Sequence, residues 1–420
     1  VDARSAAGQT PLRYAVQFGD GTELTRLLLR HGASVEAAAS DGLTPLHVAS
    51  MHGKLAQVAV LVEAGAKPNA PTTAQMGTPL HLAARHGHAK MVELLLANGA
   101  ETTTLDGEGV PPLLRAVMAG QVAASAALLT HADVNAKASD GATSLLIATA
   151  GKKEELISLL LAAGADIEMA STDGYTPLLL CAHFGLPAAL SSLFLSHGAL
   201  LNRTDNAGFT ALHTAARHGH ADIMDVLLRK AKRKDLEWRS DKGTPLHMAA
   251  RKGSKRIVLA LLAKGAKVSA TDYSRNTPLH QAVIGGHARL VRPLVEHGAD
   301  PNAKAADCMM VTDCAPLHMA VLLAQKKVVR ALVENGASLD VSSSGGTPIK
   351  VALSYGKNEM AEVLCEMSPE VCKEQLNIPD EHYSPKKPAS SKSSSKPKAK
   401  STGATQPLSK TKASKAKEEL

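Results

Sequence analysis

The feature that most constrains the fold is a six-residue motif that returns at a nearly fixed spacing. The segment Thr44-Pro45-Leu46-His47-Val48-Ala49 recurs, with one variable residue, at positions 78–83, 244–249 and 277–282. Because a fixed period of this length marks one structural unit repeated in tandem, the chain is predicted to be a linear stack of units. Looser copies of the motif begin at Thr10, Pro111, Thr143, Thr176, Thr210, Ala315 and Thr347.

The motif has the chemistry of a helix start. Thr44 can cap a helix with its hydroxyl, and Pro45 suits the first helical position, where a missing N–H costs nothing. In most units a glycine follows nine residues after the motif begins, as at Gly87, where a left-handed residue can reverse the chain. A second apolar stretch with a leucine pair follows, as at Leu95-Leu96. Each unit is therefore predicted to contain two helices.

The Thr-Pro-Leu-His-x-Ala motif at this period resembles the ankyrin-repeat family over about residues 1–372, in eleven units. The resemblance implies an all-α solenoid of helix-turn-helix units joined by short hairpin turns. It also implies that the turn tips and first helices form a concave surface for a partner protein. We assign the solenoid to residues 1–376, with residues 368–376 as a segment that caps the last unit.

Two units depart from the pattern. The fifth has its glycine, Gly151, one position early, and the tenth has Ala324 where glycine is expected. We expect local distortions at both places. The chain also begins with Val1 inside a repeat-like turn, which indicates a fragment or a processed product.

Cysteine usage favours an intracellular protein. The five cysteines form no even framework, and neither a secretory leader nor an apolar run long enough to span a membrane is present. We therefore expect reduced thiols and a cytoplasmic location, with the nucleus as the alternative.

No pattern in the sequence indicates catalysis. The phosphate-binding loop, the nucleophile elbow, the zinc-protease motif and the kinase catalytic loop are all missing. The histidines recur with the repeat period, so we expect them to form hydrogen bonds between units. The sequence therefore predicts a monomeric, non-enzymatic protein without cofactor or metal.

Apolar side chains in the turns between units are candidates for partner contact. Met309, Met310 and Val311 lie in the longest turn, between Cys308 and Cys314. Trp238, the only tryptophan, and Tyr175 lie in other turns. We predict that these five residues contact a partner protein.

A basic cluster replaces the usual turn after the seventh unit. It consists of Arg229, Lys230, Lys232, Arg233 and Lys234. Cations at a helix C-terminus are favourable, but five in six residues exceed that need. Recognition by the nuclear import machinery, an acidic partner and a merely solvated edge all fit this cluster.

The composition changes at about residue 377. Residues 377–420 hold ten lysines and four acidic residues, with much serine and proline and too few apolar side chains to build a core. We interpret this segment as a disordered basic tail. Ser384 begins a Ser-Pro-Lys-Lys sequence, which matches a proline-directed phosphorylation site, and a phosphate there would weaken polyanion binding.

Three functions remain open from the sequence. The first is a scaffold or adaptor that binds a partner protein on the concave face. The second is a nuclear or polyanion-associated regulator, which uses the tail and the 229–234 cluster to bind nucleic acid or another polyanion. The third is the regulatory arm of a larger protein.

The tail assignment predicts a pattern of limited proteolysis. Trypsin should remove residues 377–420 first and leave the repeats intact, because cleavage concentrates where the backbone is unprotected. Mass spectrometry of the early fragments measures this. If trypsin instead cleaved within the repeats before it removed the tail, the tail would be shown to dock on the protein.

Overall fold

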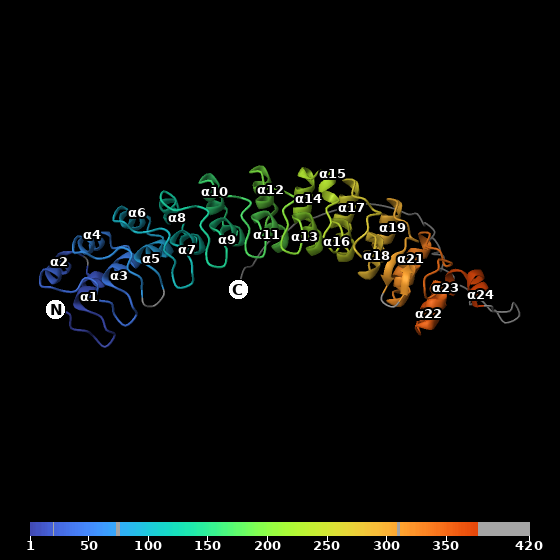
Figure 1. Cartoon of the computed structure of the whole chain (residues 1–420), viewed down its shortest axis with the longest axis horizontal. Coiled ribbons are helices and arrows are strands. Elements are labelled where there is room, and N and C mark those ends of the chain that lie inside the picture. Colours follow the sequence, from blue (N-terminus) through green and yellow to red (C-terminus); the bar gives the residue numbers. More distant parts are fainter. Residues whose placement is uncertain (20, 73–75, 309–310, 377–420) are drawn as a thin grey trace, which may run out of the picture.

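The computed structural model describes residues 1–19, 21–72, 76–308 and 311–376. Eleven helix pairs follow one another along a single arc, and the first helices with their connecting loops line its inner edge (Figure 1). The second helices lie on the outer edge. The first helices are α1 (Pro11–Phe18), α3 (Pro45–Met51), α5 (Pro79–His86), α7 (Pro112–Ala119), α9 (Ser144–Ala150), α11 (Pro177–Phe184), α13 (Ala211–His218), α16 (Pro245–Lys252), α18 (Pro278–Ile284), α20 (Pro316–Leu322) and α22 (Pro348–Ser354).

The second helices bury their leucine-rich faces against the first helices of the same unit and its neighbours. They are α2 (Glu23–Arg30), α4 (Leu55–Glu63), α6 (Ala89–Ala97), α8 (Val122–Leu128), α10 (Glu154–Ala162), α12 (Ala188–Ser196), α14 (Ala221–Lys230), α17 (Lys255–Ala263), α19 (Ala288–Glu296), α21 (Lys326–Glu334) and α23 (Asn358–Met367). The predicted helix-turn-helix solenoid is confirmed.

Small residues let the first helices of neighbouring units pack closely. The last position of the six-residue motif is alanine in ten units and cysteine in the sixth. At all eleven positions the side chain is buried, and at ten of them, including Cys181, it is 0 % exposed. These side chains and the leucines around them belong to one apolar cluster that runs through the stack.

In six of the eleven units, the histidine of the motif links the unit to the next one. In unit eight, Nδ1 of His247 accepts the backbone N–H of Thr244 at 3.1 Å, and Nε2 donates to the carbonyl of Asn276 at 3.0 Å. Asn276 directly precedes the next motif. Because a carbonyl can only accept, the ring is neutral with its proton on Nε2. The predicted hydrogen bonds between units are confirmed, and His81, His213, His280 and His318 bond in the same way. His47 accepts from Thr44 likewise, but its Nε2 donates to the carbonyl of Ala70.

A left-handed residue ends the first helix in most units, as predicted from the glycines. Gly87 has φ of 79°, whereas Gly19 departs from the prediction with φ of −69°. The two irregular units keep the left-handed turn without glycine: Lys152 and Ala324 both have φ of 55°. The distortion that we expected in units five and ten is therefore confined to one strained residue in each turn, and the turn itself is regular.

Three elements interrupt the regular pairs. A short helix, α15 (Arg233–Leu236), follows α14. A two-stranded antiparallel hairpin, β1 (Ala305–Cys308) and β2 (Val311–Cys314), joins units nine and ten. Helix α24 (Pro369–Leu376) packs on the last unit and forms the predicted cap. Over the described part of the chain, no helix is long and apolar enough to cross a membrane.

Replacing Ala324 with glycine should stabilise the solenoid by about 0.5–1 kcal/mol. The left-handed conformation costs a residue with a Cβ about 1–2 kcal/mol, and the extra freedom of glycine in the unfolded chain offsets part of that gain. Urea unfolding measures the change. Gly87→Ala, in the equivalent turn of unit three, should destabilise, and a destabilised Ala324→Gly variant would contradict the strain.

Acid should destabilise the solenoid through the linking histidines. Burial lowers the pKa of His47, His213 and His280 to about 4, from 6.5. Between these values the unfolded chain binds protons that the folded chain does not. The stabilisation is therefore complete above pH 6.5 and falls with pH from 6.5 towards 4, by about 1.4 kcal/mol per pH unit for each ring.

The measurement is the urea midpoint as a function of pH. His280→Gln should flatten the acid limb, and His31→Gln, at an exposed histidine, should leave its slope unchanged. Equal slopes in both variants and the parent would show that the linking rings do not control acid stability.

Candidate protein-binding surface

A hollow on the inner face of units seven to nine combines charged and polar side chains from all three units. Its volume is about 510 Å³. Exposed cations line it from the first helices of units seven and eight and from the turn before α16. They are Arg217, Lys242, Arg251 and Lys252.

The Arg251 guanidinium is held by neighbouring side chains. Its Nη1 donates to Oε1 of the buried Gln281 at 3.1 Å, and Nε2 of Gln281 donates to Oδ2 of Asp272 at 2.7 Å. Asp272 also accepts the backbone N–H groups of Ser274 and Asn276, at 2.9 and 2.8 Å. A neutral amide thus orients Arg251 and leaves its charge uncompensated.

The corresponding place in unit four is built differently. There Arg115 pairs directly with the buried Asp106 and, at 2.7 Å, with Glu108. Burial opposes ionisation of Asp106, but the hydrogen bonds from Arg115 and from two backbone N–H groups outweigh it and lower the pKa of this carboxyl. The unit-four site is therefore neutralised internally, whereas Arg217, Lys242, Arg251 and Lys252 are in no ion pair with any described residue.

The tip of unit nine, beside the hollow, carries two unusual residues. Tyr273 is 92 % exposed, the highest value among the large apolar side chains described. Arg275 has φ of 60° at a position where six other units have a left-handed glycine. Its guanidinium lies 3.9 Å from Asp313 at the next tip, which is also left-handed, with φ of 53°.

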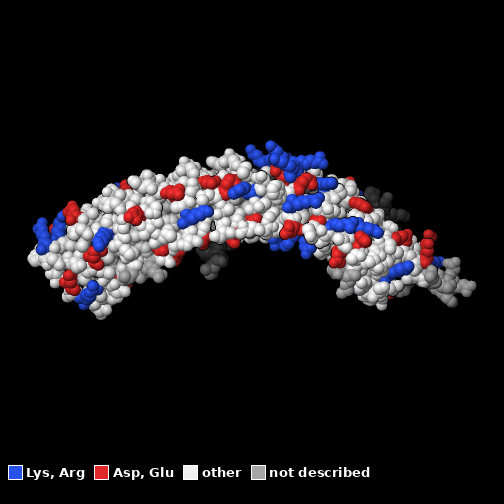
Figure 2. Space-filling view, viewed as in Figure 1, with Lys and Arg blue, Asp and Glu red and all other residues white. Residues whose placement is uncertain are grey.

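The predicted basic cluster lies on the opposite edge of the molecule. Arg229 and Lys230 end α14, Arg233 and Lys234 belong to α15, and Lys232 lies between them. All five side chains are exposed, and Figure 2 shows basic residues gathered on the outer edge where Figure 1 places α15. Among the described residues, none of the five forms an ion pair.

Two of the predicted partner-contact residues lie in accessible turns. Trp238 follows α15 and is 42 % exposed. Tyr175 is half-buried, and its hydroxyl lies 3.2 Å from Nδ1 of His183. Burial raises the pKa of Tyr175. Neither residue lines the hollow, and their contact with a partner stays a prediction.

The prediction for the turn of unit ten needs a correction. Val311 is 1 % exposed, because β2 turns its side chain into the apolar cluster that runs through the stack. It is therefore unavailable to a partner in this structure. Met309 and Met310 lie outside the described residues, as do Ser384 and the whole 377–420 tail.

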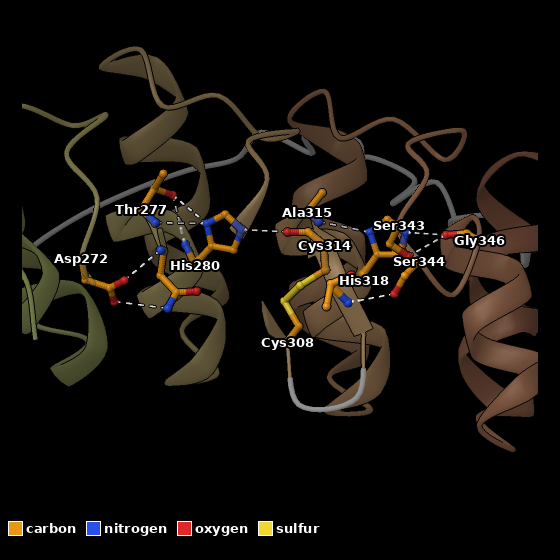
Figure 3. Close-up of a disulfide and its surroundings, with 12 residues drawn as sticks. Asp272, Thr277, His280, Cys308, Cys314, Ala315, His318, Ser343, Ser344 and Gly346 are labelled. Atoms are coloured by element: carbon orange, nitrogen blue, oxygen red, sulfur yellow. Dashed lines mark hydrogen bonds between the residues drawn. A yellow bond between two sulfur atoms is a disulfide. The ribbon is translucent and has the colours of Figure 1, made fainter. Parts of the chain in front are cut away.

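The expectation of reduced thiols is also wrong for four cysteines. Cys308 pairs with Cys314 across the β1–β2 hairpin, beside His280 and His318 (Figure 3), and Cys365 pairs with Cys372 between α23 and α24. Cys181 is free and buried, and burial raises its pKa to about 12. Structural disulfides are rare in the cytosol, so the thiols no longer support an intracellular location.

Sequence reasoning noted Arg251 and Lys252 only as an extension of the 229–234 cluster, and it missed Arg217, Lys242, Tyr273 and Arg275. Arg217 and Arg251 lie seven residues after their motifs begin, in α13 and α16. A comparison of this position across units, followed by a search for tips that lack glycine, could have found both features.

Comparison with known protein families agrees with the repeat structure. A model described as ankyrin repeats (3 copies) matches residues 145–237 and 230–305, and one described as ankyrin repeats (many copies) matches residues 46–96. A single ankyrin repeat model matches residues 7–40 and 312–344. No curated protein matches the chain. The chain thus belongs to the ankyrin-repeat family, whose repeats generally mediate interactions between proteins.

Proposed function

We propose that the protein is a non-enzymatic scaffold that holds a partner protein along the inner face of units seven to nine. The observation that carries this proposal is the hollow lined by Arg217, Lys242, Arg251 and Lys252, none of which forms an ion pair with a described residue, although Arg217 lies over the ring of Phe209. Uncompensated, oriented cations on a concave surface favour electrostatic recognition of a complementary partner.

The repeat architecture supports the same surface. Arg217, Arg251 and Lys252 project from α13 and α16, which are packed against first helices on both sides. A rigid array of this kind binds without the ordering cost that a flexible loop would incur. Polar groups around the cations, such as Gln281 and Asp272, further restrict their positions.

A second candidate function rests on the outer edge. The 229–234 cluster places five exposed cations around α15, which suits a polyanion such as nucleic acid. Phosphate contacts release counterions, so this binding would weaken steeply with salt. The inner and outer surfaces lie on opposite edges of the arc and can be tested separately.

Site-specific photo-crosslinking in cells should locate the partner on the inner face. A photoreactive amino acid in place of Ile284, which lines the hollow, should give protein adducts, and one in place of the outer-face Leu259 should not. Arg217→Glu with Arg251→Glu should abolish the Ile284 adducts because both cations reverse. Gel mobility and mass spectrometry identify the adducts.

The matched control changes charge by the same amount on the outer edge. Arg229→Glu with Arg233→Glu should leave the Ile284 adducts intact, as should deletion of residues 377–420. Thermal unfolding of every variant checks the fold. Two results would contradict the inner-face proposal: adducts that form only from Leu259, and adducts that are lost only in the Arg229→Glu, Arg233→Glu variant. Either result would favour the 229–234 cluster as the functional surface.

A further inference from the structure

We propose that the partner contributes an extended acidic segment whose carboxylates are spaced about three residues apart. This inference rests on the proposed function and specifies the chemistry of its ligand. It follows from three properties of units seven to nine: their charge, the spacing of their cations, and the strained tip of unit nine.

Charge is strongly polarised along the solenoid. Residues 201–300 contain 18 lysines and arginines against nine acidic residues, whereas residues 101–200 contain four against ten. Part of the excess lies on the outer edge, in the 229–234 cluster. The remainder includes the cations of the hollow, so an acidic ligand is attracted to units seven to nine and repelled by the units before them.

The cations also have a regular spacing. Arg217 and Arg251 occupy the same position in neighbouring units, seven residues after Thr210 and Thr244. Stacked helices of neighbouring units lie about 8–10 Å apart. An extended peptide in the polyproline II conformation rises about 3.1 Å per residue, so three residues cover about the same distance. Carboxylates at that spacing can meet successive units.

Acidic residues in the same hollow favour a peptide over a nucleic acid. The exposed Asp241 and the half-buried Asp272 line the hollow together with the cations. A continuous phosphodiester backbone would be repelled by these carboxylates and has no N–H groups to offer them. An extended peptide presents backbone N–H donors between its acidic side chains, and so matches both signs of charge.

The tip of unit nine adds a cation in a costly conformation. Arg275 is left-handed where glycine would be unstrained, and strain of this kind persists where it serves a function. Its contact with Asp313, at 3.9 Å between exposed side chains, is too weak to account for it. Arg275 therefore adds an exposed cation at the tip that also carries the exposed Tyr273 and Ser274, which lines the hollow.

Fluorescence anisotropy with two labelled peptides tests the spacing. The first repeats Glu-Pro-Ser about five times, which keeps it extended, and the second has the same composition with its glutamates contiguous. At about 150 mM salt, where screening acts within about 8 Å, the spaced peptide should bind the full chain about fivefold or more tightly than the contiguous one. Arg217→Glu with Arg251→Glu should remove this binding.

Two glycine variants separate recognition from folding. Arg275→Gly should raise the urea midpoint, because it relieves strain, yet weaken binding of the spaced peptide about threefold or more. Asp313→Gly relieves the equivalent strain at the next tip and removes an acidic neighbour, so it should retain or improve binding. A purely structural role for Arg275 would leave peptide affinity unchanged.

The outcomes distinguish this inference from the proposed function. Equal affinity for the two peptides, or an unaffected Arg275→Gly variant, overturns the inference even if Ile284 still gives protein adducts. If the Ile284 adducts are also lost, both the inference and the proposed function are overturned. Duplex DNA that displaces the spaced peptide at equal phosphate and carboxylate concentration, with sensitivity to Arg217→Glu and Arg251→Glu, would replace the acidic peptide with nucleic acid.

Discussion

Contact between neighbouring units is the constraint on which the rest of the structure depends. No single helix pair can bury its apolar face alone, so each unit is stable only while its neighbours are in place. The buried alanine positions bring the helices together, and rings such as His247 join one unit to the backbone that opens the next. Because these links are internal, side chains at the inner face and the turn tips can change without loss of the fold.

This freedom is visible in how the same frame handles charge. In unit four, Arg115 is neutralised by Asp106 and Glu108. In unit nine, Gln281 occupies the place corresponding to Arg115, and Asp272 the place corresponding to Asp106. The Gln281 amide donates to Asp272 and accepts from Arg251, so it connects the two residues by hydrogen bonds. Because the amide is neutral, it does not cancel the charge of Arg251. Glutamine in place of arginine at this position therefore replaces an internal ion pair with an amide that orients the exposed Arg251 of the preceding unit.

The sequence was sufficient for the frame because the frame is encoded locally. The threonine caps, the linking histidines and the irregular turns at Lys152 and Ala324 all follow from residues a few positions apart. The burial of Val311 and the pairing of Cys308 with Cys314 depend instead on a hairpin whose register no period encodes. The hollow likewise combines side chains from three units, and its properties required their relative positions in space.

The extra helix α15 gives the two candidate functions different places on the molecule. Where other units return to the inner edge through a Gly-Ala turn, unit seven has the cluster 229–234, and its cations stay on the outer edge. In the sequence, these charges are close to those at the end of α16. In the folded chain the two sets of charges are separated by the thickness of a helix pair. Since one helix is roughly 10 Å across, this thickness is about 20 Å. Since that distance exceeds the screening length in physiological salt, neither set strengthens the other's binding, and each must recognise its ligand with its own geometry.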